Sequence, residues 1–146
     1  MGAAGQPVLS AEAQAALDGR LCDAAAKGDA AAIERLAAEG ASPDAKSSGT
    51  AAVYGEPAVR VAANWGHAGA VSALVRLGAD LDATDERGWT ALIIAAANGR
   101  VECARALLAG GADRTLRPTG GYWEGMTALE IAEAEGMAEV AALLRG

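Results

Sequence analysis

Residues 85–113 read DERGWTALIIAAANGRVECARALLAGGAD, and they form the most regular part of the chain. The pattern predicts a hairpin turn at Gly88, a short helix that begins after Thr90, and a tight turn at Asn98-Gly99. A second helix rich in alanine and leucine follows, and Gly111 ends it. We therefore expect this stretch to fold as a projecting loop followed by two short helices.

The same arrangement of glycines recurs along the chain. The glycine between the two helices appears as Gly28, Gly66, Gly99 and Gly136, with spacings of 38, 33 and 37 residues. The glycine that ends the second helix appears 12 residues later each time, as Gly40, Gly78 and Gly111. A nearly fixed period in this range is typical of a stacked array of repeats.

The period predicts one domain with four units. We expect a flexible tail over residues 1–9 and a single domain over residues 10–146, with units at residues 10–40, 41–78, 79–111 and 112–146. Each unit has one apolar face and cannot bury it alone, so stacking builds the core. We predict a monomer, because a polar outer surface on the last unit is supplied by Glu130, Glu133, Glu135 and Glu139.

Composition argues against several classes of partner. The chain of 146 residues has a net charge of −7, so nucleic acid phosphates and anionic membranes would repel it. No apolar run approaches the roughly 18 residues that span a bilayer. The N-terminal residues lack the basic start and apolar centre of a secretory signal. We expect a cytoplasmic or nuclear protein that binds neither nucleic acid nor membrane.

The residues that usually carry chemistry are few and separated. His67 is the only histidine, and Cys22 and Cys103 read as small buried thiols in helices. Four nitrogen or sulfur ligands for zinc are therefore not available within the chain. No nucleophile elbow, phosphate loop or dinucleotide fingerprint is present. We expect no catalytic residues, no metal and no cofactor.

The repeated unit resembles the ankyrin repeat family. The third unit has the family's Gly-x-Thr start, alanine-rich first helix, Asn-Gly turn and Gly-Ala-Asp end, and the other units keep parts of this pattern in register over roughly residues 17–146. The resemblance implies an all-α solenoid of stacked helix-turn-helix units with projecting hairpin loops. It also implies a protein-binding scaffold whose first helices and loops line a concave face, and it places His67 in the turn between helices.

Two departures from the family stand out. The Thr-Pro-Leu-His tetrapeptide reads Pro57-Ala58-Val59-Arg60 in the second unit and lacks histidine in the third and fourth. The cross-repeat hydrogen bonds that the resemblance assigns to this histidine are then missing, and we expect a less rigid stack. The loops into the second and fourth units carry five and four extra residues. These insertions are either tolerated drift, since longer loops cost little free energy, or binding fingers.

The five aromatic residues supply the candidate binding site. None falls on a predicted core position, and the resemblance puts them on loop tips and first-helix ends that face ligands. Trp89 also has a structural interpretation, as packing on the neighbouring hairpin, and Trp65 fits either interpretation. The predicted partner-binding residues are Tyr54, Glu56, Asn64, Trp65, Arg87, Trp89, Asn98, Tyr122, Trp123 and Glu124; Lys27 and Glu135 are further polar candidates on the same face.

Three functions are compatible with this interpretation. The first is a protein–protein interaction module that binds through its concave face and hairpin loops. The second is a regulatory or targeting subunit that inhibits or positions a partner enzyme through the same surface. The third is an enzyme, for which the sequence offers no constellation of catalytic residues. The partner's identity does not follow from the sequence.

Overall fold

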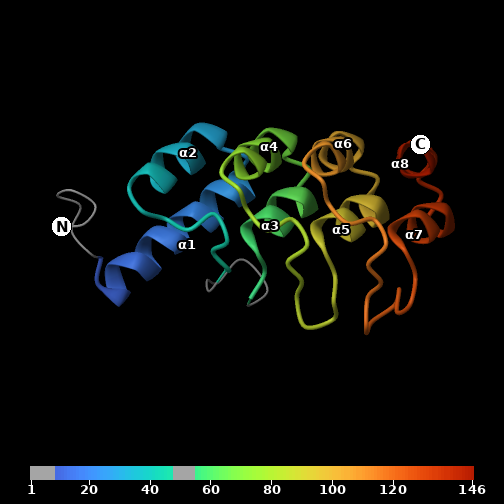
Figure 1. Cartoon of the computed structure of the whole chain (residues 1–146), viewed down its shortest axis with the longest axis horizontal. Helices are drawn as coiled ribbons and strands as arrows, with labels where there is room; N and C mark the ends of the chain where they lie inside the picture. Colours follow the sequence, from blue (N-terminus) through green and yellow to red (C-terminus); the bar gives the residue numbers. More distant parts are fainter. Residues whose placement is uncertain (1–8, 48–54) are drawn as a thin grey trace.

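The computed structural model describes residues 9–47 and 55–146, and these residues form eight helices. The helices are α1 (Ala11–Lys27), α2 (Ala30–Ala38), α3 (Ala58–Asn64), α4 (Ala68–Arg76), α5 (Ala91–Asn98), α6 (Val101–Ala109), α7 (Ala128–Ala134) and α8 (Ala138–Arg145). Consecutive helices pair, and the pairs stack along one axis, which confirms the predicted all-α solenoid (Figure 1). Of the expected tail, only Leu9 lies within the described residues.

The helices form two rows (Figure 1). The first helices α1, α3, α5 and α7 lie side by side, and the second helices α2, α4, α6 and α8 form the other row. The loops into the third and fourth pairs extend from the row of first helices, beyond its edge. We call the surface formed by the first helices and these loops the inner face. The binding site predicted from the sequence was expected on this surface.

The core lies between the two rows and consists mainly of small aliphatic side chains. In α5 every residue from Ala91 to Ala97 is buried, because this helix has neighbours on both sides in its row and α6 behind it. Leu74, Leu107 and Val140 contribute from the second helices. Alanine allows helices to approach closely, which explains how a chain without phenylalanine fills its core.

The first helices of the third and fourth units, α5 and α7, both begin with a threonine cap. The side chain of Thr90 accepts a hydrogen bond from the backbone N–H of Ile93. Thr127 and Glu130 form a complete capping box at α7, in which each side chain bonds the other residue's backbone N–H. These bonds satisfy donors that a helix leaves free at its first turn.

The turn glycines also provide space for the next unit. Gly28 and Gly99 have φ values of 77° and 69°, which favour glycine. A Cβ atom on Gly28 would lie 2.6 Å from His67 Cγ, and one on Gly99 would lie 2.7 Å from Met137 Sδ. His67 therefore packs in the inter-helix turn, where the resemblance places it, and each glycine is needed both for its backbone angle and for the contact across units.

Cross-unit hydrogen bonds are present despite the missing histidines. The Asp44 carboxylate accepts from the Asp80 N–H at 2.7 Å, and the Asp82 carboxylate accepts from the Asp113 N–H at 2.8 Å. Arg60, which occupies the histidine's place in the second unit, forms an ion pair with Asp85 of the third at 3.3 Å. The histidine bonds are absent, as the sequence predicts, but other side chains connect the units at this junction; the predicted lower rigidity of the stack stays a prediction.

Both cysteines are free and buried, as expected. Burial raises the pKa of the Cys22 thiol to about 12, with smaller contributions from Asp23 and Asp18. Burial likewise raises the pKa of Cys103. Because the thiolate is the reactive form, neither thiol is activated at neutral pH.

Candidate functional site

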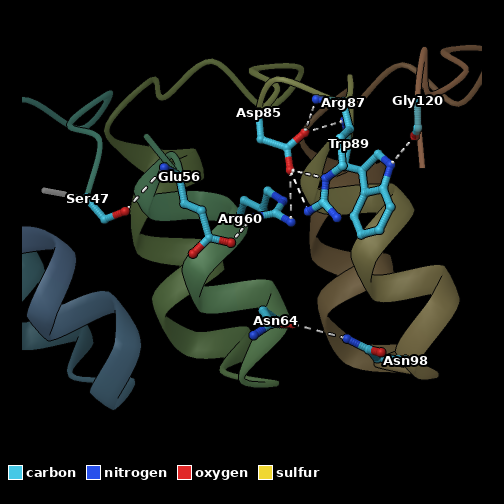
Figure 2. A network of polar contacts seen from close by, with 9 residues as sticks. All are labelled: Ser47, Glu56, Arg60, Asn64, Asp85, Arg87, Trp89, Asn98 and Gly120. Carbon is cyan, nitrogen blue, oxygen red and sulfur yellow. Dashed lines mark hydrogen bonds and ion pairs between the residues drawn. The ribbon is translucent and has the colours of Figure 1, made fainter. Parts of the chain in front are cut away.

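A network of hydrogen bonds and ion pairs lies on the inner face where the loop before α5 meets the loop before α7 (Figure 2). Asp85 accepts hydrogen bonds from the backbone N–H groups of Arg87 and Trp89, at 2.9 and 3.1 Å. It also pairs with the Arg87 guanidinium at 2.9 Å. Burial acts to raise the pKa of Asp85, but these hydrogen bonds and the nearby Arg60 outweigh it and hold the pKa below its ordinary value.

Arg87 and Trp89 stack on each other at this tip. The Arg87 Cζ atom lies 3.4 Å from the centre of the Trp89 ring system. A guanidinium over an indole face is a favourable cation–π arrangement. The Asp85 ion pair holds the guanidinium in place, so the hairpin presents a fixed tip.

The insertion before the fourth unit folds onto this tip. We call residues 118–125 the Tyr122 loop. The Thr119 N–H donates to the Arg87 carbonyl at 2.8 Å, and the Trp89 indole N–H donates to the Gly120 carbonyl at 3.0 Å. A Cβ atom at Gly121, whose φ is 87°, would lie 2.8 Å from Trp89 Cζ2. The four extra residues are therefore an ordered cover over Trp89.

Two of the tryptophans pack against other parts of the fold. The ring centres of Trp89 and Trp123 lie 4.7 Å apart, and both side chains are partly buried against the core. The Trp123 indole N–H also donates to Glu135 at 3.2 Å. The expectation that no aromatic packs with the core is wrong for these two residues, and for Trp89 the structural interpretation holds.

Tyr122 is different, because the same loop turns its ring outward. The residue is 84% exposed, and its ring stands nearly perpendicular to that of Trp123, at a centre distance of 6.0 Å. Trp89 and Trp123 pack against each other and are partly buried, which leaves Tyr122 as the exposed ring at this tip.

Trp65 lies at the other end of the first helices. It is 55% exposed and follows α3, beside the Asn64–Asn98 hydrogen bond of 3.3 Å. Figure 2 shows Asn64 and Asn98 at the ends of α3 and α5 that point away from the hairpin tips. The predicted site residues therefore fall into two groups at opposite ends of the helices. Tyr54 lies outside the described residues.

Glu56 does not lie on the surface, which corrects its assignment as a surface contact. It is buried and forms an i,i+4 ion pair with Arg60, which is also buried and points toward Asp85 (Figure 2). Burial lowers the pKa of Arg60, and Asp85 opposes that effect. Sequence reasoning missed this Glu56–Arg60–Asp85 cluster, although an arginine at the tetrapeptide's last position, four residues after a glutamate, is a usable signal.

Within the described parts of the chain, no three His, Cys, Asp or Glu side chains gather so that they could hold a metal ion. Across those same residues, no helix is both long and apolar enough to cross a membrane. The remaining polar candidates Asn98 and Glu124 are exposed, and Arg87 is partly exposed.

Comparison with protein families agrees with the fold. A model that describes three copies of the ankyrin repeat matches residues 21–118 and again residues 61–146. Ankyrin repeats are generally protein–protein interaction modules, and proteins of this kind are typically not catalytic. Because these matches cover most of the 146 residues and the helices pair and stack as the repeat requires, the chain belongs to the ankyrin repeat family.

Proposed function

We propose that this protein binds a partner protein through its inner face, with Tyr122 and Trp65 as the two principal contact residues. The observation that carries the proposal is the exposure of Tyr122, 84%, on a loop whose backbone is hydrogen-bonded to the neighbouring hairpin and within itself. Tyrosine and tryptophan are enriched among residues that dominate binding energy at protein interfaces. Because the loop is already ordered, burying Tyr122 would cost little conformational entropy.

A capture experiment with matched variants tests this proposal. The double variant Tyr122→Ala/Trp65→Ala removes the two rings that are exposed among the described residues. The control Arg76→Ala/Arg105→Ala, which we call the outer-row variant, removes two exposed side chains of α4 and α6 in the row of second helices. Immobilised wild-type protein and the outer-row variant should retain the same set of proteins from a cell extract, while the ring variant loses them. Far-ultraviolet circular dichroism should be the same for all three. Equal capture by the ring variant would overturn the proposal.

The regulatory or targeting role uses the same surface and differs in its consequence. If a captured partner is an enzyme, its activity with and without this protein separates inhibition from positioning. Inhibition lowers turnover in solution, whereas positioning leaves turnover unchanged and alters where the enzyme acts. The ring variant serves as the control for either effect.

A further inference from the structure

The Tyr122 loop is held in one conformation by its own backbone and by its neighbour. The Gly125 N–H donates to the Pro118 carbonyl at 2.9 Å and closes the base of the loop. The Glu124 N–H donates to the Gly121 carbonyl at 3.2 Å, so Tyr122 and Trp123 occupy the two central positions of a tight turn. The Tyr122 ring stands nearly perpendicular to that of Trp123, at a centre distance of 6.0 Å, and the residue remains 84% exposed, so most of its ring is open to solvent.

The cations around this loop are already neutralised. Arg87 pairs with Asp85 at 2.9 Å, and Arg117 pairs with Glu130 at 3.2 Å. By contrast, Glu124 on the loop and Glu86 next to Arg87 are exposed and have no cationic partner among the residues that the structure describes. The surface around Tyr122 therefore carries uncompensated negative charge, in a chain whose net charge is −7.

We propose that the Tyr122 loop binds a basic segment of the partner protein, with an arginine or lysine side chain over the Tyr122 ring and neighbouring cations near Glu86 and Glu124. An aromatic face attracts a cation, and adjacent carboxylates add to the attraction in the same place. An acidic or purely apolar segment would leave both carboxylates without a counter-charge. This inference rests on the proposed function and specifies the chemistry of the partner.

Binding of labelled peptides, followed by fluorescence anisotropy at low and physiological salt, tests the proposal. The probes are an arginine–glycine repeat peptide, a glutamate–glycine repeat peptide and a serine–glycine repeat peptide of equal length. We expect the arginine peptide alone to bind, and salt to weaken it. Tyr122→Ala should weaken binding by about twofold to fivefold, the range of an exposed cation–π contact, and Tyr122→Phe should retain it.

A charge-matched pair of variants separates a local site from general attraction. Glu86→Gln/Glu124→Gln removes the charge of Glu124 on the Tyr122 loop and that of Glu86 next to Arg87, and Glu12→Gln/Glu139→Gln removes two exposed charges on α1 and α8. The first double variant should weaken binding several-fold and reduce its salt dependence, while the second should have little effect. Equal weakening by both variants, binding that Tyr122→Ala leaves unchanged, or preference for a neutral or acidic peptide would overturn the inference.

The two proposals fail separately. If arginine peptides do not bind but Tyr122→Ala/Trp65→Ala still abolishes capture of protein partners, the basic-segment inference is wrong and the interaction function stands. If the ring variant captures the same proteins as the wild type, the proposed function itself is wrong.

Discussion

Replacing Arg60 with alanine should destabilise the protein far more than replacing Arg76, although both arginines pair with a carboxylate of another unit at 3.3 Å. The Arg60 and Asp85 side chains are 4% and 8% exposed, whereas those of Arg76 and Glu34 are 57% and 48% exposed. Arg60 connects α3 to the loop that carries Asp85, so its loss removes a buried contact between the second and third units. The two sites therefore compare a buried and an exposed ion pair of similar length.

The size of the effect follows from what each variant leaves behind. Without Arg60, Asp85 keeps its pair with Arg87 at 2.9 Å, but Glu56 becomes a buried carboxylate with no ion-pair partner among the described residues. Breaking a buried pair on one side costs about 3–5 kcal/mol, and with one carboxylate still paired we expect about 3 kcal/mol. An exposed pair contributes about 0–1 kcal/mol, which is the expected cost of Arg76→Ala.

Urea denaturation followed by circular dichroism and by tryptophan emission measures both costs. For a domain of this size, about 3 kcal/mol corresponds to a fall in Tm of about 6–12 °C, which a thermal melt would show independently. The reasoning is refuted if Arg60→Ala costs no more than Arg76→Ala, because Glu56 and Asp85 would then be solvated rather than buried. Arg60→Ala/Glu56→Gln should recover part of the loss, since it removes the orphaned charge.

Three further outcomes follow from the structure. Gly121→Ala should move the Tyr122 loop away from Trp89, and the positive φ alone should lower the free energy of unfolding by about 1–2 kcal/mol. Acrylamide quenching of tryptophan fluorescence should then rise, and unchanged quenching would contradict the packing of the loop on Trp89. Thr127→Ala should lower the free energy of unfolding by about 1 kcal/mol in urea titrations, because the capping box at α7 is lost; no change would mean that the helix start is frayed. Asp85 has a folded pKa below its ordinary value of 3.8, so its contribution to stability is present above that value and is lost as pH falls through the folded pKa. The stability of Asp85→Asn should therefore fall less than that of the wild type as the pH is lowered from neutral to below 3.8, and parallel curves would rule this out.

The ankyrin solenoid was predictable because its signals are local in the sequence. Gly28, Gly66, Gly99 and Gly136 each adopt a positive φ, in agreement with the turn positions that their spacing predicts. Threonine caps such as Thr90 accept a hydrogen bond from a backbone N–H within the same helical turn, and the apolar residues recur with the period of a helix. Each of these features depends on residues only a few positions apart.

The sequence predicts which residue types belong to the candidate site, but not which of their side chains are exposed. Trp89, Tyr122 and Trp123 all read as loop aromatics, yet the fold packs two of them and exposes one. The difference arises because Trp89 is covered by Gly120 and Gly121, about thirty residues later in the chain. Glu56 likewise reads as a surface charge, but in the fold it is buried and paired with Arg60, which also pairs with Asp85 of the next unit. Helix limits and turn positions depend on neighbouring residues, so the sequence by itself determines them. The exposure of a loop side chain depends on which segment of the next unit packs against it, and that contact exists only in the folded stack.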